Sequence, residues 1–455
     1  MKKFLIVSGV LVGIIVTISG IISLSNQSKT DKESRNGKNQ INDSIPLLLM
    51  GSYLNLSETI SLDSLKIGLE NGKIVCTNDI KSSVKERLKL TGEPKTINLN
   101  KFNFKSSNDL IITTLDSVDQ RFLCVNLNNT NFFKTPKSYP LWIKYDKGDF
   151  SFEKEITSYT HTGVTALTRG SGRTLDTKGI DFYLQNILSY FKNPEIVHIS
   201  NEVSYQDTCF YESMKMRFAT KKKHFEIFNK LGVDIVELTG NHNLDVGEEP
   251  YMKSLKWYKE NGMNYFGGGA SPSEANKPLI RELKDKHKIA WIGFNELCPC
   301  SECADTKMGS NRYSEVKAKR LIDSLKNQAK VDYILACVQY GEVDSYSPTT
   351  NQKKICQKLI DFGADVVIGS QAHQAQEIAM YKGKTIFYGL GNFMFDQIHR
   401  LGVRQAFFLE CYFYKGKIIQ FQPIYTFMNQ ERQPTPATKT EKLEIQKAIL
   451  KESNF

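Results

Sequence analysis

Polar segments that could do chemistry follow directly after several apolar runs of the 455-residue chain. Glu202 comes at the end of the first run, and Asn241 and His242 follow the second. Glu342 follows the third run, and His373 follows the fourth. A further polar residue, Asn392, follows a later apolar run. Open α/β sheets bind ligands at the carboxyl ends of their strands, so these segments predict one shared site.

The residue types in these segments suit metal-assisted or acid–base chemistry. Glu202 and Glu342 could hold a cation or serve as a base, and His242 and His373 could ligate a metal or move protons. Each histidine alone would more often be hydrogen-bonded in a turn. The chain has seven histidines, and two of them, His242 and His373, come directly after predicted buried strands and beside amide residues. This placement favours a common site.

One carboxylate lies inside an apolar strand pattern instead of after it. Glu237 alternates with apolar neighbours and is expected to be buried, where a carboxylate needs a partner. A structural ion pair with Arg169 is one interpretation. Arg169 could alternatively bind an anionic group through its bidentate guanidinium.

The elements that position these residues alternate as in βαβ units after Thr160. Two hairpins, turning near Lys382-Gly383 and Lys415-Gly416, close the pattern. We therefore expect a sheet with helices on its faces and an antiparallel end. The predicted strands are Glu195–Ile199, Val233–Leu238, Lys288–Phe294, Val331–Val338 and Ala364–Ile368, and the predicted helices are Phe218–Leu231, Pro250–Asn261, Ser314–Gln328 and Thr350–Phe362.

The N-terminus predicts a membrane anchor. Phe4 to Leu24 carries no charge and is long enough to cross about 30 Å of hydrocarbon as a helix. A cleaved secretory signal is the alternative, but its apolar region is usually shorter. Lys2 and Lys3 would hold the N-terminus in the cytoplasm and leave the remainder outside a bacterial cell membrane.

Composition divides the whole chain into five predicted segments. Residues 1–25 are the expected transmembrane helix and 26–45 a flexible linker with few apolar residues. Residues 46–150 predict a small α/β or mainly β domain of unknown role. Residues 155–430 form the expected main domain, and 431–455 a polar tail that is predicted to be helical.

The net charge of +11 suits an acidic polymer or an anionic envelope surface. No compact basic stripe with interleaved aromatic residues is present, so nucleic acid is not an expected partner. Of the nine cysteines, Cys337 and Cys356 look like core residues. Cys298, Cys300 and Cys303 favour a disulfide-bonded or redox-sensitive loop over a zinc site, with Cys209 as one candidate partner.

Several long motifs resemble the capsule-synthesis CapA family. They are GNHNLDVG from Gly240, LIDFGADVVIGSQAHQAQ from Leu359 and FYGLGNFMFDQ from Phe387, with weaker similarity at TGVTALTRG from Thr162 and at Asn201-Glu202. The resemblance covers about residues 160–430. It implies a four-layer α/β/β/α metallophosphoesterase-like sandwich and a role with an extracellular polymer, poly-γ-glutamate in the best-known members.

Related phosphoesterases carry a two-metal centre, which the resemblance projects onto particular residues of this chain. Asn241 and His242 match the family's Asn-His pair and Asp245 the following aspartate, while Glu202 matches the early carboxylate. The late positions correspond to His373, Gln376 and Asn392. The metal ligands implied in this way are Asn241, His242, Glu202 and His373.

The chain also departs from the family pattern at three places. Val164 replaces the expected first carboxylate, Gln339-Tyr340-Gly341 replaces a His-Trp-Gly run, and Ser370-Gln371 replaces successive histidines. Cations prefer carboxylate and imidazole donors to amides. We therefore expect at most one divalent metal ion, of undetermined identity.

Two functions stay open at this point. The first is an anchored, outward-facing component in synthesis, export or anchoring of a capsular polymer, with the membrane, an anionic polymer or envelope substrate and other capsule-synthesis or export proteins as partners. The alternative is a metal-dependent, phosphoesterase-like hydrolase of an envelope substrate. The expected catalytic residues are His242, His373, Glu202 and Glu342, and the expected substrate-binding residues are Arg169, Gln371, Gln376 and Asn392.

Overall fold

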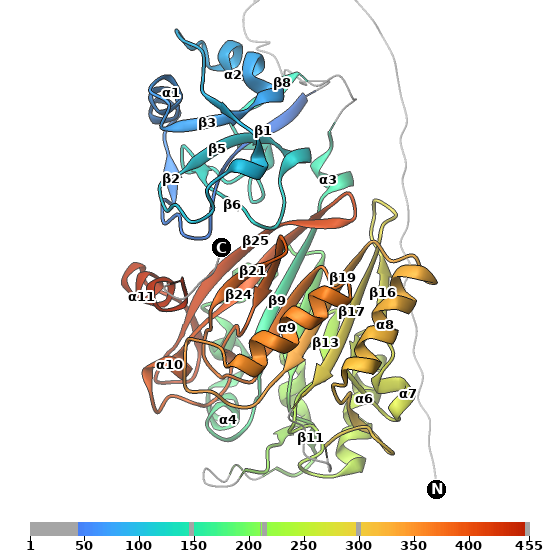
Figure 1. The fold of residues 1–455 in the computed structure, drawn as a ribbon. Helices are drawn as coiled ribbons and strands as arrows, with labels where there is room; N and C mark the ends of the chain where they lie inside the picture. Colours follow the sequence, from blue (N-terminus) through green and yellow to red (C-terminus); the bar gives the residue numbers. More distant parts are fainter. Residues whose placement is uncertain (1–43, 145–149, 210, 212–215, 297–301, 451–455) are drawn as a thin grey trace, which may run out of the picture. The chain divides into compact units, whose positions relative to one another are not determined.

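The computed structural model describes residues 44–144, 150–209, 211, 216–296 and 302–450 (Figure 1). The predicted anchor and almost all of the predicted linker lie outside these residues. Within the described ranges, no helix is both long and apolar enough to cross a membrane. Residues 43–455 form one compact unit.

The first part of this unit is a mixed sheet with its own core. Its strand order is β4-β3-β5-β1-β6, with β8 also paired to β1. All eight residues of β1 are buried, which fits a central strand covered on both faces. The strands are β1 (Ser44–Gly51), β3 (Ile74–Thr77), β4 (Thr96–Ile97), β5 (Leu110–Thr114), β6 (Leu123–Cys124) and β8 (Trp142–Lys144), with helices α1 (Leu62–Glu70) and α2 (Lys81–Leu88).

The rest of the unit is built from two larger sheets. The first sandwich sheet has the order β14-β13-β10-β9-β24-β25-β26, with β23 beside β9. Its β9, β10, β13 and β14 run parallel, while β24 to β26 are antiparallel. The strands are β9 (Thr157–Thr165), β10 (Ile196–Asn201), β13 (Ile235–Glu237), β14 (Asn264–Phe266), β23 (Asn392–Met394), β24 (Gln405–Tyr414), β25 (Lys417–Met428) and β26 (Pro434–Pro436).

The second sandwich sheet has the order β16-β17-β19-β20-β22-β21. Its four central strands are parallel, and each of its two edge strands runs antiparallel to its neighbour. The predicted hairpin at Lys382-Gly383 joins β21 to β22. The strands are β16 (Leu279–Glu282), β17 (Lys288–Asn295), β19 (Tyr333–Gln339), β20 (Val366–Ser370), β21 (Ile378–Tyr381) and β22 (Lys384–Phe387).

Side-chain alternation along the strands sets the order of the layers. In β19, Leu335 and Cys337 belong to the core between the two sandwich sheets, whereas Ala336 and Val338 belong to the core under the outer helices. Helices α8 (Glu315–Asn327) and α9 (Thr350–Phe362) cover that outer face. Helices α4 (Arg169–Leu184), α5 (Glu226–Leu231) and α6 (Glu248–Glu260) cover the outer face of the first sandwich sheet. The layers are therefore α/β/β/α (Figure 1).

The mixed N-terminal sheet is packed against this sandwich. Tyr412 and Tyr414 of β24 belong to its core, and the rings of Phe133 and Tyr412 stack with centroids 4.5 Å apart. Gln120 donates a hydrogen bond to the backbone carbonyl of Asp365 at 3.1 Å. These contacts explain why residues 43–455 behave as one compact unit.

The predicted strands and helices of the main part are confirmed, with one exception. Residues 218–231 are not one helix, since β12 (Thr220–Lys221) and a 3-10 turn (Lys222–Phe225) precede α5. The strand pairs with β11 (Tyr205–Gln206), and Thr220 Oγ1 binds His224 Nδ1 at 2.9 Å. These local bonds outweigh the helical spacing. The predicted tail helix is α11 (Lys439–Leu450), preceded by β26.

Candidate functional site

Most of the predicted site residues meet where strands of the two sandwich sheets end. Glu202 follows β10, His242 follows β13, and His373 follows β20. Gln339 is the last residue of β19 and joins groups from both sheets. We call the set the strand-end cluster: Glu202, Asn241, His242, Gln339, Glu342, Gln371, His373 and Asn392.

The side chain of Gln339 lies at the centre of this cluster. Its Nε2 donates to Glu202 Oε1 at 2.7 Å and to Asn241 Oδ1 at 3.2 Å, and it also contacts Gln371 Oε1. Its own Oε1 accepts a hydrogen bond from Asn295 Nδ2 at 2.7 Å, which fixes the amide orientation. The neutral amide of Gln339 thus orients the side-chain oxygens of Glu202, Asn241 and Gln371.

Glu202 is a buried carboxyl group with one oxygen left over. Only 1% of the residue is exposed, and its Oε2 has no hydrogen-bond partner within the described part of the chain. Burial raises the pKa of Glu202, and the nearby charges of His373 and His242 offset part of that effect. The protonated carboxyl is therefore favoured more than in water, as a proton donor requires.

His373 is held between an amide and a carboxylate. Asn392 Nδ2 donates to the carbonyl of Val403 at 3.1 Å, so its Oδ1 accepts from His373 Nδ1 at 2.9 Å. His373 Nε2 lies 3.1 Å from Glu342 Oε1. Burial lowers the pKa of His373, but the bond to Glu342 and the charge of Glu202 outweigh it and raise the pKa overall. The imidazolium form is thus supported.

His242 is oriented by the carboxylate three residues further on. Its Nδ1 lies 2.8 Å from Asp245 Oδ2, which also accepts the backbone N–H of Phe218 at 2.7 Å. The ring of Phe218 packs on the imidazole with centroids 4.1 Å apart. A histidine that donates through Nδ1 keeps a lone pair on Nε2, which suits a base or a ligand.

Two predicted substrate-binding residues have their side chains engaged elsewhere. Arg169 Nε donates to Asp396 Oδ2 at 3.0 Å, and its Nη2 reaches the same carboxylate. Its guanidinium carbon lies 4.3 Å from the ring centroid of Phe218. Gln376 Oε1 accepts from Gln352 at 3.0 Å, so this amide secures helix α9.

The strand-end cluster fits a two-metal centre poorly. Val164, at the position of the missing carboxylate, is 1% exposed and pairs with Asn392 across the strands. The N–H groups of Gln339 point at Glu202 Oε1 and Asn241 Oδ1, the oxygens that a cation would need. Hydrogen-bond donors aimed at the same oxygens compete with a cation for them.

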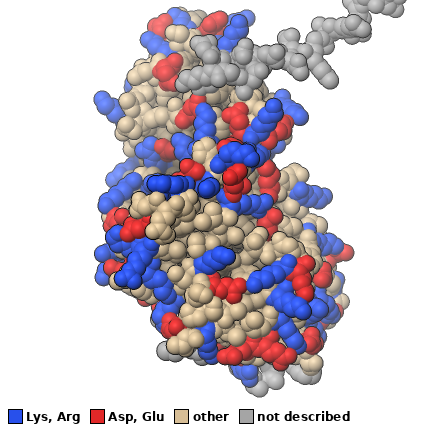
Figure 2. All heavy atoms as spheres, turned by 90° about the vertical axis from the view of Figure 1, so that its right-hand side faces the viewer, with Lys and Arg blue, Asp and Glu red and all other residues tan. Residues whose placement is uncertain are grey.

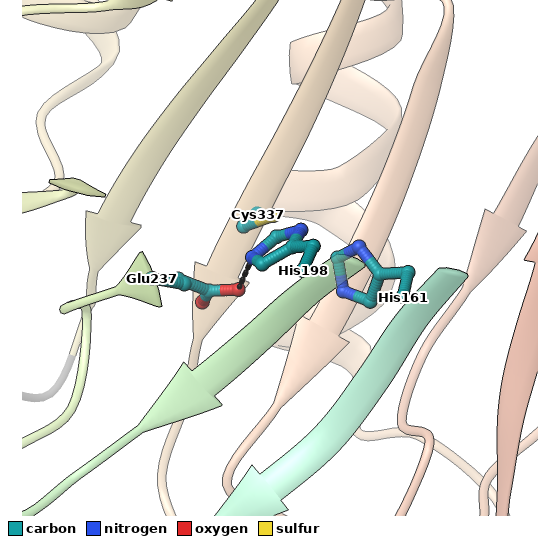
Figure 3. Close-up of side chains that lie close together, drawn as sticks. All are labelled: His161, His198, Glu237 and Cys337. Atoms are coloured by element: carbon teal, nitrogen blue, oxygen red, sulfur yellow. Dashed lines mark ion pairs between the residues drawn. The ribbon is translucent and has the colours of Figure 1, made fainter. Parts of the chain in front are cut away.

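A different group brings metal-ligand types together. In the described part of the chain, His161, His198, Glu237 and Cys337 place one ligand atom each within 4.8 Å of all the others, and all four residues are buried (Figure 3). They come from β9, β10, β13 and β19. We call this set the interior cluster because it lies between the two sandwich sheets.

Hydrogen bonds orient the interior cluster. The Tyr159 hydroxyl lies 2.7 Å from His161 Nδ1 and 2.6 Å from His198 Nδ1, and it accepts the indole N–H of Trp291 at 3.1 Å. His198 Nε2 is 3.4 Å from Glu237 Oε2. The other oxygen of Glu237 accepts the hydroxyl of Thr239. The predicted pairing of Glu237 with Arg169 is therefore wrong, because Arg169 pairs with Asp396.

Burial drives the members of the interior cluster toward their uncharged forms. It lowers the pKa of His198 to about 3 and that of His161 well below 6.5. It raises the pKa of the Glu237 carboxyl, and it raises the pKa of the Cys337 thiol, with the nearby Glu237 charge adding to that effect. Neutral imidazoles are the form that ligates metals.

Sequence reasoning missed this cluster because it treated Cys337 as a core residue and searched after the strands. The available signal was positional. His198, Glu237 and Cys337 each lie inside a predicted strand, at positions where apolar residues were expected to face the core. Polar side chains at inward positions of neighbouring strands point into a common space.

The cysteine-rich loop is partly described. Cys303 is disulfide-bonded, which agrees with the preference for a disulfide over a zinc site. Cys209 is free and is not its partner. Cys298 and Cys300 lie outside the described residues.

The layers and the polar groups at the strand ends define an α/β sandwich protein with its site at the carboxyl ends of parallel strands. A family model described as bacterial capsule synthesis protein PGA_cap matches residues 147–397, and the chain belongs to that family. The resemblance predicted from the sequence is thereby confirmed. The matched range begins eight residues before the predicted main domain (155 against 147) and ends within it.

Two curated relatives agree with the family. The chain is 24% identical over 252 residues to the capsule biosynthesis protein CapA of Bacillus anthracis, covering 54% of this chain and 61% of that protein. It is 23% identical over 250 residues to the PGA biosynthesis protein CapA of Bacillus subtilis (strain 168), covering 54% and 65%. The chain thus spans less than two thirds of either relative's length.

Solved structures give weaker similarity. A hypothetical protein from Thermus thermophilus aligns with a TM-score of 0.37 at 13% identity, covering 59% of this chain and 98% of that one. The NAD nucleotidase of Haemophilus influenzae aligns with a TM-score of 0.36 at 16% identity, covering 64% and 55%.

Proposed function

We propose that this chain acts in synthesis, export or anchoring of an extracellular anionic polymer such as poly-γ-glutamate. Membership of the capsule-synthesis family supports the proposal. The site adds a chemical reason, which lies in the hydrogen-bond donors of the strand-end cluster.

The observation that carries the proposal is the direction of two amides. The side-chain oxygens of Gln371 and Asn241 both face the NH₂ group of Gln339, which shares its two hydrogens among these oxygens and Glu202 Oε1. Each of the two amides therefore keeps its own NH₂ group for another acceptor. Neither NH₂ group has a partner within the described ranges. The raised pKa of His373 favours a positive charge beside them, although both of its ring nitrogens are already bonded to Asn392 and Glu342. Such NH₂ donors suit amide carbonyls and carboxylates, the two polar groups of a poly-γ-glutamate chain.

The surface charge supports an acidic partner. The chain carries 60 Lys and Arg against 49 Asp and Glu, which gives a net charge of +11. Figure 2 shows the basic side chains spread over the viewed face with acidic ones among them, not gathered in one stripe. A dispersed positive excess attracts a polyanion without the directed contacts that nucleic-acid recognition uses.

We further infer that residues 1–25 anchor the chain in the bacterial cell membrane with the described unit outside. The uncharged run from Phe4 to Leu24 after two lysines supports an anchor. The disulfide at Cys303 fits an oxidising compartment. Protease treatment of intact cells should digest the described unit if it faces outward, and protection would contradict this orientation.

A binding experiment tests the proposed function. The purified full chain, in detergent, is titrated with poly-γ-glutamate of defined length. Gln371→Ala should weaken binding about tenfold or more, since a hydrogen bond to a charged group contributes about 1.5–3 kcal/mol. Gln376→Ala removes the same amide where it faces helix α9 and should leave binding unchanged. Absence of binding, or equal loss in both variants, would contradict the proposal.

One observation favours a hydrolase as a second candidate. The unpaired Glu202 Oε2 lies near His242 and His373, which could pass a proton to or from it. Phosphoester and γ-glutamyl substrates can be assayed with and without divalent ions. Turnover that disappears in His242→Ala would support this candidate, and no turnover under any condition would eliminate it.

A further inference from the structure

We propose that the interior cluster, formed by His161, His198, Glu237 and Cys337, binds one divalent cation of the zinc class and thereby joins the two sandwich sheets. This site is separate from the strand-end cluster. It does not depend on the proposed polymer function.

The position of the ligands across the sandwich supports a cross-sheet site. His161 and His198 are register partners on β9 and β10, and Glu237 lies one strand further, opposite Ser200. Cys337 comes from β19 of the second sandwich sheet. Figure 3 shows the two imidazoles and the carboxylate on neighbouring strands, with Cys337 beside them on another strand. A bound cation would therefore bond to both sheets.

The donor types select the class of cation. Zinc takes imidazole, thiolate and carboxylate ligands with bonds of about 2.0–2.3 Å, usually four of them. Calcium and magnesium prefer oxygen ligands alone. The four atoms already lie within 4.8 Å of one another, so small side-chain rotations would bring them to zinc distances.

The Tyr159 hydroxyl prepares at least one imidazole as a ligand. It has a single proton, so it can donate to only one of the two Nδ1 atoms it contacts. The other imidazole must donate its own Nδ1–H to the hydroxyl oxygen, which leaves a lone pair on its Nε2. Trp291 holds the hydroxyl from the other side. Outer hydrogen bonds of this kind orient metal-ligating histidines.

A purely structural hydrogen-bond network explains the cluster less well. The surrounding space between the sheets is filled by apolar side chains such as Leu335, Ile368 and Phe387. His198 Nε2 is buried and makes no hydrogen bond within the described part of the chain, and the carboxylate oxygen Oε2 of Glu237 lies 3.4 Å from it. A buried polar atom without a hydrogen bond destabilises the fold, and coordination would remove that cost.

A small cavity adjoins the ligands. It measures about 10 Å³, and His161, Glu237 and Gln371 are among the residues that line it. That volume is about the size that one water molecule requires. The site therefore has room for one additional small ligand on the side that faces the strand-end cluster.

Cobalt provides a direct probe. The purified full chain is freed of metal and titrated anaerobically with Co²⁺, without reductant, so that the disulfide at Cys303 stays closed. We expect one cobalt per chain, with a near-ultraviolet sulfur-to-cobalt charge-transfer band that reports thiolate coordination, and about one zinc in protein isolated from zinc-containing medium. A folded wild-type chain that shows neither would overturn the proposal.

Matched cysteine variants locate the signal. Cys337→Ser should abolish the charge-transfer band. Cys356→Ser should retain it, because Cys356 is equally buried but lies on helix α9, where it contacts Tyr340. A band that survives in folded Cys337→Ser would place the metal at another thiol and overturn the assignment. If Cys337→Ser does not fold, Glu237→Gln keeps the shape of the side chain and should weaken cobalt binding at least tenfold.

Discussion

The strand-end cluster and the interior cluster are supplied by neighbouring positions of the same strands. Glu202 follows the strand that contains His198, and Gln339 is the last residue of the strand that contains Cys337. In the first cluster a neutral amide is central, and its N–H groups face the carboxyl oxygen. In the second, buried imidazole, carboxylate and thiol groups converge between the two sandwich sheets.

We infer from this difference that the metal-binding position of this chain is not the one that the family pattern implies. Three places in the family's metal-site pattern carry a buried valine or neutral polar side chains, whereas Glu202, His242 and His373 keep groups that could ligate a metal. A second set of ligand types lies deeper between the sheets. A metal found in this protein would then be structural, while the strand-end cluster would recognise polymer without it.

The largest contrast should come from the same substitution made in each cluster. Glu237→Gln should remove bound zinc almost completely, because an amide is a poor zinc ligand. Glu202→Gln should leave zinc content unchanged and should raise the melting temperature at neutral pH, since burial disfavours the charged carboxylate. Elemental analysis and thermal melts measure both. Zinc loss in Glu202→Gln alone would reverse the comparison.

Removing the hydroxyl that orients the histidines should have a smaller effect. Tyr159→Phe deletes the group shared by both Nδ1 atoms while keeping the buried ring. Loss of an outer-shell partner typically weakens metal affinity about 10–100-fold. Competition with a fluorescent chelator measures the change. An unaltered affinity would show that the hydroxyl does not set the imidazole tautomers.

The role of Gln339 at the centre of the strand-end cluster can be tested by measuring stability. Gln339→Ala should lower the free energy of unfolding by about 2–4 kcal/mol, because it leaves buried partners unpaired and opens a cavity. Denaturant titration measures the loss. Zinc content should stay at the wild-type value, and a parallel loss of metal would indicate that the two clusters are not separate.

The smallest effect concerns the His373–Glu342 pair. The pKa of His373 is raised above 6.5, so its contribution is present below 6.5 and is lost as the pH rises through the folded value. The pKa of Glu342 is lowered from 4.5, mainly by the hydrogen bond from His373, so its contribution is present above 4.5 and is lost as the pH falls through the folded value.

The pair should therefore stabilise the fold most between these limits. Glu342 is half-exposed, and the benefit should be about 1 kcal/mol or less. Comparing the stability of Glu342→Gln with wild type across this pH range measures it, and an NMR titration should show a lower pKa for His373 in the variant. A stability difference that does not vary with pH would contradict the ion pair.

Much of the fold was predictable from the order of strand-like and helix-like segments along the chain. The apolar runs around Val236 and Val338 indicate buried strands because strands covered on both faces are apolar throughout. The periodic helix Thr350–Phe362 begins and ends where its cap residues predict. The segment from Phe218 failed because helical spacing there competes with a strand pairing that only the fold reveals.

The strand-end residues were predictable as a group, but their bonding was not. The rule that sites lie at strand ends gathers Glu202, His242 and His373. It cannot show that Arg169 is already paired with Asp396, because 227 residues separate them. The interior cluster needed the pairing of strands from two sheets, which no local pattern contains.

Anomalous X-ray diffraction at the zinc edge tests the separation of the two clusters most directly. Crystals of the zinc-loaded protein should show one peak between the sandwich sheets, within bonding distance of Cys337 Sγ and Glu237. A peak at Glu202, His242 and His373, with none between the sheets, would contradict the account.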